Sequence, residues 1–203
     1  MSILNLSTRT GGLPEYTWAN RPTKPQTMDY IVITDIGPSK EIFFYTGSRW
    51  IPLNGNIVLA QTNTRIDLTG VTGLVEMASV AVKGGMMSAN GMLEIYTLWG
   101  YTNSANSKTL GIRLGGSGGT AFFARSETTS AVHHAMTIIR NANSVSSQVG
   151  VGSALAGGLG STSGTLITSS VNTANDTTVS ITGNLASAAE TITLYGYKVL
   201  YRE

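Results

Sequence analysis

The sequence predicts an all-β protein, and three observations support that prediction. Only 12% of the 203 residues are charged, against about 25% in an average globular protein, so Ser, Thr, Asn and Gly must cover the surface. Short hydroxyl and amide side chains favour turns and strands over helices. Apolar residues alternate with polar ones, and Asn, Ser and Gly clusters interrupt them about every ten to fifteen residues, as in β-sandwiches.

Residues 1–60 are predicted to form an extended arm and a small three-stranded β-meander. Proline recurs in residues 1–24, and it is excluded from central strands and disfavours helix before it. We therefore expect an arm held by something outside itself, with a frayed terminus as the alternative. The meander is expected at residues 30–35, 41–45 and 49–53, and it is too small to bury a good core alone.

Residues 61–203 are predicted to form a jelly-roll-like antiparallel β-sandwich. Short strands separated by turn residues are typical of that architecture. About eight strands are expected, at residues 74–82, 93–99, 110–114, 121–125, 135–140, 165–171, 177–182 and 191–201. Only residues 185–190 have the composition of a helical turn.

Composition and charge argue against several classes of function. The net charge is +2 and Lys and Arg occur singly, so nucleic acid is not an expected partner. The absence of cysteine excludes disulfides, thiolate zinc sites and cysteine nucleophiles. The sequence contains no secretion signal and no apolar run of about 20 residues, so we expect synthesis in the cytoplasm and no membrane insertion.

Few residues are candidates for metal binding. His133 and His134 are the only histidines, and neighbours on a strand point to opposite faces, so the pair cannot readily hold one ion. The glycine-rich residues 150–160 lack the Lys-Ser/Thr ending and the following helix of a phosphate loop, and they are interpreted as a surface loop. We expect no metal and no cofactor.

Catalysis is not expected either. Glu94 flanks a strand, Asp176 lies in a turn-like segment, and Glu190 follows the possible helical turn, so each carboxylate has an ordinary structural explanation. A glycosidase pair drawn from Glu94, Glu127 and Asp176 remains the enzymatic alternative, because the separation of two carboxylates cannot be read from sequence. The prediction is a protein that is not an enzyme.

Aromatic residues are the better candidates for interaction. The N-terminal region offers candidate attachment contacts at Tyr16, Trp18, Phe43, Tyr45 and Trp50. Two predicted strands offer a second set, at Tyr96, Trp99, Tyr101, Tyr195, Tyr197 and Tyr201, of which the last three share parity and hence a face. A tyrosine-lined face is half of the core, a subunit interface or a sugar-stacking platform.

Three stretches, residues 83–91 (KGGMMSANG), 97–116 and 184–197, together resemble a C-terminal β-domain of tailed-bacteriophage virion proteins, among them tail-fibre, head-fibre and decoration proteins. Residues 35–53 resemble the small β-module that precedes such domains. The resemblance implies a location on the virion surface and assembly as a homotrimer, and it transfers no catalytic residue.

Two functions are compatible with this resemblance. The first is a capsid decoration or short head-fibre protein, whose N-terminal region binds the major capsid protein or another virion protein. Length favours it, because the chain has no heptads, triple-stranded repeat or collagen-like run to build a long shaft. The second is a receptor-binding tail-fibre or tail-tip protein that recognises a bacterial surface glycan.

Overall fold

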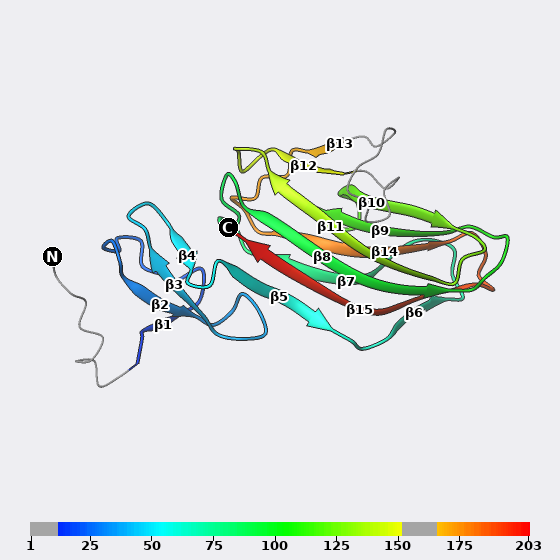
Figure 1. The fold of residues 1–203 in the computed structure, drawn as a ribbon, viewed down its shortest axis with the longest axis horizontal. Coiled ribbons are helices and arrows are strands. Elements are labelled where there is room, and N and C mark those ends of the chain that lie inside the picture. The colour runs from blue at the N-terminus through cyan, green and yellow to red at the C-terminus, as the bar shows by residue number, and fades with distance from the viewer. Residues whose placement is uncertain (1–11, 152–165) are drawn as a thin grey trace.

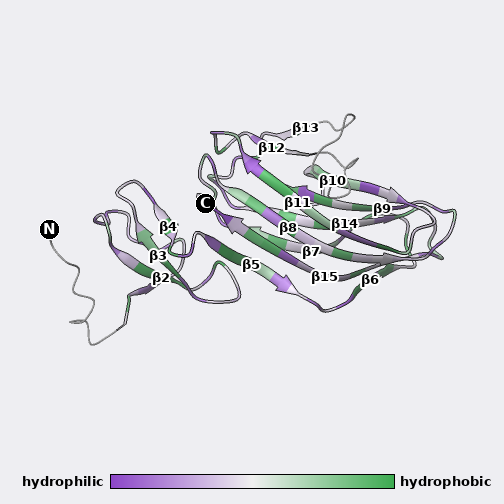
Figure 2. Cartoon of the chain, viewed as in Figure 1, coloured by the Kyte–Doolittle hydropathy of each residue, from purple (hydrophilic) through white to green (hydrophobic). Residues whose placement is uncertain are grey.

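The protein was analysed as a computed structural model, which describes residues 12–151 and 166–203. A small N-terminal sheet adjoins one end of a larger β-sandwich, and the C-terminus lies at that same end (Figure 1). Apolar residues lie mainly within the strands (Figure 2). The described residues contain no helix, so the all-β prediction is confirmed, and none of them forms a membrane-spanning helix.

The N-terminal module is a four-stranded sheet. Its strands lie in the order β1 (Glu15–Tyr16), β2 (Tyr30–Ile33), β3 (Glu41–Tyr45) and β4 (Trp50–Pro52). The three antiparallel strands β2 to β4 match the predicted meander. Strand β1 was not predicted.

Strand β1 comes from the segment that was predicted to be an arm. Its backbone pairs in parallel with β2, where Val32 N–H donates to Pro14 O at 2.9 Å and Thr34 N–H donates to Tyr16 O at 3.1 Å. Proline therefore flanks this strand instead of preventing it. The chain itself holds this part of the predicted arm, while residues 1–11 lie outside the described residues.

The sandwich consists of two antiparallel sheets. One has four strands in the order β10 (Thr120–Glu127), β9 (Lys108–Leu114), β14 (Thr177–Leu185) and β7 (Gly73–Val82). The other has seven, in the order β13 (Leu166–Ser169), β12 (Gln148–Val151), β11 (Val132–Asn141), β8 (Met92–Tyr101), β15 (Thr191–Arg202) and β5 (Asn56–Thr62), with β6 (Ile66–Thr69) also paired to β15.

Eight of these strands have the order of a jelly roll. These are β5, β7, β8, β9, β10, β11, β14 and β15, counted first to eighth along the chain. In the seven-stranded sheet β11, β8, β15 and β5 lie side by side, and they are the sixth, third, eighth and first of the eight. The other sheet consists of β10, β9, β14 and β7, which are the fifth, fourth, seventh and second of the eight. This interleaving of two Greek keys confirms the jelly-roll prediction. Strands β5, β6 and β12 were not predicted. In the segment expected to be a helical turn, Leu185 ends β14 and residues 186–190 form a bend and a turn.

The core lies between the two sheets and follows the alternation expected from sequence. On β8, Leu93, Ile95 and Trp99 are fully buried, while Leu98 on the opposite parity is exposed. Ile112 of β9 and Ile181 of β14 close the core from the other sheet. The inward half of each strand therefore supplies the hydrophobic stabilisation of the sandwich.

Polar contacts and a close backbone approach join the two modules. Trp18 Nε1–H donates to Gly84 O at 2.8 Å, and Lys83 Nζ lies 3.9 Å from Asp35 Oδ2. A Cβ at Gly37 would lie 2.2 Å from Val58 O, so only glycine fits against β5 at this position. The module thus packs directly on the end of the sandwich.

Candidate functional site

The outer face of the seven-stranded sheet is uncovered within the described residues, and we call it the open face. The inner face packs against the four-stranded sheet. Large apolar side chains are exposed on the open face at Val132, Met136, Leu98, Leu166 and Tyr195, with exposed fractions from 43% to 71%. Exposed apolar side chains that gather on one surface mark interaction sites.

Strand register makes several of these side chains neighbours. Met136 lies opposite Tyr96, and Leu98 lies opposite His134, on adjacent rows of the β8 and β11 pair. Side chains opposite one another on the same face of a sheet lie about 5 Å apart at Cβ. The apolar groups are therefore contiguous across β8 and β11.

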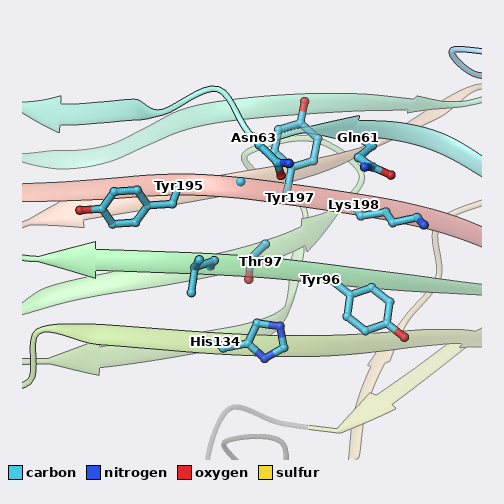
Figure 3. Close-up of a pocket in the computed structure, with 10 residues that line it drawn as sticks. Gln61, Asn63, Tyr96, Thr97, His134, Tyr195, Tyr197 and Lys198 are labelled. Atoms are coloured by element: carbon cyan, nitrogen blue, oxygen red, sulfur yellow. The ribbon is translucent and has the colours of Figure 1, made fainter.

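A shallow depression of about 340 Å³ lies near the middle of the open face (Figure 3). It forms where β15 bulges, because the register with β8 shifts between Leu194 and Gly196. A Cβ at Gly196 would lie 2.9 Å from both Asn63 Oδ1 and Thr62 O, so glycine permits this close approach. The depression is lined by Gln61, Asn63, Tyr96, Thr97, Leu98, His134, Tyr195, Gly196, Tyr197 and Lys198.

The lining combines aromatic rings with polar groups of several kinds. Tyr195 and Tyr96 supply rings at separate parts of the depression, while Asn63, His134 and Lys198 supply amide, imidazole and ammonium groups (Figure 3). Such a surface can pack against a protein side chain or stack and hydrogen-bond to a sugar. It presents no carboxylate of its own.

An ion pair between a nearly buried carboxylate and a partly exposed arginine supports the open face from one side. Glu94 is only 8% exposed, and its Oε2 lies 2.9 Å from Arg202 Nε. The Tyr96 hydroxyl donates to the same oxygen at 3.2 Å. Burial, followed by the charge of Glu94, raises the pKa of Tyr96, so this ring stays a neutral phenol.

The second set of predicted aromatic residues is divided between surface and core. Tyr96, Tyr195 and Tyr197 line the depression, although Tyr197 also packs against the core, whereas the side chains of Trp99, Tyr101 and Tyr201 are buried. The expectation that Tyr195, Tyr197 and Tyr201 share a face is wrong, because the bulge in β15 interrupts the alternation of side chains. Tyr195 is 43% exposed, and Tyr201 is 1% exposed.

The first set of predicted aromatic residues lies mostly inside the N-terminal module. Trp18 packs on Phe43 and Tyr45 packs on Trp50, each with ring centroids 5.4 Å apart. Trp18, Phe43 and Trp50 are buried, while Tyr16 and Tyr45 are partly exposed. A role of this set in attachment stays a prediction, and the two partly exposed tyrosines are its accessible members.

The two histidines point to opposite faces, as predicted. His133 faces inward and stacks on Phe123 with a centroid distance of 5.7 Å, and burial lowers its pKa. His134 is exposed on the open face. Among the residues that the structure describes, no group of three or more His, Asp or Glu side chains is placed to hold a metal.

The carboxylates of the enzymatic alternative all have protein partners. Glu94 pairs with Arg202 as above, Glu127 pairs with Arg125, and Asp176 accepts from Gly84 N–H at 2.7 Å. Glu94 and Glu127 are also buried. Each has a structural role in the fold.

A buried ion pair was missed by the sequence analysis. Lys108 is fully buried, and its Nζ lies 3.1 Å from Glu190 Oε2 and 2.9 Å from Ser104 Oγ. Hydrogen bonds from Asn106, Ser104 and Lys108 lower the pKa of Glu190. The alternation along β9 was the available signal, because Lys108 occupies an alternate position together with the core-facing residues of that strand.

Comparison with known proteins gives distant structural similarity. No protein-family model matches the sequence, and no curated protein matches it. The chain is similar to the VP2 subviral particle structure of infectious bursal disease virus, with 10% identity, a TM-score of 0.31, and coverage of 88% of this chain and 45% of that one. A structure of the Gx strain of that virus gives 12% identity, a TM-score of 0.23, and coverage of 72% and 39%. This chain thus spans less than half of either chain.

Proposed function

We propose that this protein is a non-enzymatic structural component of a bacteriophage particle, a capsid decoration or short head-fibre protein. In this proposal the jelly roll assembles as a homotrimer through the open face, and the N-terminal module attaches to the major capsid protein or another virion protein. The virion assignment rests on the sequence resemblance at residues 83–91, 97–116 and 184–197.

The open face is the observation that supports assembly. Fully burying one large apolar side chain contributes about 1.5–3 kcal/mol, and Leu98, Met136 and Tyr195 are each a little less than half exposed. A closed ring of identical subunits would cover this face in every copy. The low charge of the chain also reduces repulsion between copies.

The absence of catalysis belongs to the same proposal. The partners of Glu94, Glu127 and Asp176 support it, because a glycosidase needs two accessible carboxylates at a defined separation. Release of sugar from host surface material by the purified protein, abolished by Glu127→Gln, would contradict this part.

Electron microscopy of the intact particle, with the protein located by a specific antibody, tests the location. We expect density on the capsid lattice. Density found at the tail tip alone would overturn the decoration assignment and favour the second candidate.

That second candidate is a glycan-binding tail or fibre tip, and the depression beside Tyr195 supports it. The test is binding of the purified protein to host surface polysaccharide, for the unaltered chain and for Tyr195→Ala. Glycan binding that is lost in Tyr195→Ala while the oligomer persists would establish this function. It would also show that the depression stays accessible in the assembly, and so restrict subunit contacts to other parts of the open face.

A further inference from the structure

A groove of about 390 Å³ lies at the junction of the two modules. Aromatic rings and prolines form much of its surface, together with two arginines and no acidic residue. The lining residues that matter here are Trp18, Arg21, Pro22, Pro25, Tyr45 and Arg49. The lining thus carries positive charge, and Glu203 compensates only the part that belongs to Arg49.

Arg49 shows how this junction holds a carboxylate. Its guanidinium pairs with the side-chain carboxylate of Glu203. The same carboxylate accepts from Ser88 Oγ at 2.7 Å and from the Tyr201 hydroxyl. An arginine of the N-terminal module thus binds an acidic side chain from the segment that follows β15.

Arg21 has no such partner. Its guanidinium lies 4.0 Å from the centroid of the Trp18 ring and donates to Trp18 O. All eleven Asp and Glu residues lie in the described ranges, and none of them forms an ion pair with Arg21. Burial lowers the pKa of Arg21, which is the expected effect of desolvating a cation that no anion compensates.

We propose that this groove binds an extended acidic peptide segment of a partner protein, with a carboxylate of that segment paired to Arg21. The planar guanidinium can donate two parallel hydrogen bonds to one carboxylate while it remains stacked on Trp18. Tyr45, Pro22 and Pro25 supply the apolar surface for the adjoining residues. The inference names the chemistry of the attachment partner, and in that respect it rests on the proposed function.

A peptide fits this groove better than a nucleic acid does. Extended peptides bind in grooves lined by aromatic rings, where the peptide backbone packs on the ring faces. Nucleic acids need several cations to neutralise successive phosphates. Here Arg21 is the one lining arginine without a carboxylate, since Arg49 already pairs with Glu203.

The test uses the full chain and two labelled synthetic peptides, one of alternating Pro and Glu and one of alternating Pro and Gln. We expect the Glu peptide to bind, measured by fluorescence anisotropy, and the Gln peptide to bind at least about tenfold more weakly, since hydrogen bonds to charged groups stabilise by about 1.5–3 kcal/mol. Arg21→Gln should weaken binding of the Glu peptide by a similar factor. Lys40→Gln removes an exposed cation of the N-terminal module outside the groove lining, and as the control it should bind the Glu peptide normally.

Equal binding of the two peptides, no binding of the Glu peptide, or full binding by Arg21→Gln would each overturn the proposal. If Arg21→Gln fails to fold, the salt dependence of the unaltered protein decides, because an ion pair at Arg21 requires affinity to fall as salt rises. Particle location is measured separately, so a decoration protein that ignores the Glu peptide would lose this inference and keep its proposed function.

Discussion

The two outer faces of the sandwich are built from the same jelly roll and differ in chemistry. On the four-stranded sheet the outward residues are mostly short and polar, as where Thr109 Oγ1 lies 2.8 Å from Ser126 Oγ and Ser180 donates to Glu76. We call this the hydroxyl face. On the open face the corresponding positions include Leu98 and Met136.

This difference concerns only the alternate residues of each strand that point away from the core. The inward halves of both sheets are apolar and packed into one core, so core formation does not explain why one outer face is apolar. A sheet face that contacts water can carry short polar side chains, as at Thr109 and Ser126, although Leu74 of the same face is 47% exposed. The apolar side chains of the open face therefore suggest a surface that another molecule covers.

Placing a charge on each face is expected to give the largest contrast. Leu98→Asp should prevent assembly, because an unpaired charge buried at a contact costs about 3 kcal/mol, or roughly 100-fold in association at each contact. Ser79→Asp places the same charge at an exposed position of β7 on the hydroxyl face and should leave assembly unchanged. Sedimentation of both variants checks this. Equal oligomers for both would remove the distinction between the faces.

Two residues of one strand separate folding from assembly. Ile95→Ala should lower the free energy of unfolding by about 2–5 kcal/mol, because Ile95 is fully buried between the sheets. Leu98→Ala should change it by less than about 1 kcal/mol while it weakens assembly. Denaturant unfolding, performed on dissociated chains, measures both. A loss for Leu98→Ala as large as for Ile95→Ala would mean that Leu98 belongs to the core.

The adjacent histidines allow a pH test that compares a buried side chain, His133, with an exposed one, His134. Burial and the charge of Arg125 lower the pKa of His133, so the unfolded chain binds a proton at higher pH than the folded chain does. Stability should be full above the usual histidine pKa of about 6.5 and should fall as pH decreases through it, by at most about 1.4 kcal/mol per pH unit.

His133→Gln should flatten this dependence, measured by thermal unfolding between mildly alkaline and mildly acidic pH. His134→Gln is the control, since its side chain is exposed on the open face. An unchanged slope in His133→Gln would contradict the assignment of the buried ring as the source.

The smallest effect is expected on the hydroxyl face. Thr109→Val removes an exposed hydrogen bond to Ser126 and should change the free energy of unfolding by less than about 0.5 kcal/mol. Oligomeric state should not change. A variant that assembles differently would show that the hydroxyl face also makes contacts.

Much of the fold could be predicted from the sequence, because alternation and turn residues are local signals. The strand predicted at residues 93–99 lies within β8, and His133 and His134 were correctly placed on opposite faces. Strand β1 was not predicted because it forms only by pairing with β2, a segment that lies further along the chain. A two-residue strand between prolines has no local pattern that would predict such pairing.

The candidate site was harder to predict. The bulge at Tyr195 shifts the alternation within β15, and nothing in the local pattern reports it. Tyr201 therefore lies in the core, while Tyr195 lies on the open face. The buried Lys108 could have been found from its parity with Leu110, although its partner Glu190 is 82 residues away.

The most direct measurement of the central claim is the mass of the unaltered chain in solution by sedimentation equilibrium, together with protection of Met136 and Tyr195 from oxidative surface labelling. We expect three times the monomer mass, and we expect labelling of both residues to rise sharply in Leu98→Asp. A monomeric chain in which both residues label freely would contradict the account, because the open face would then be exposed in the native protein.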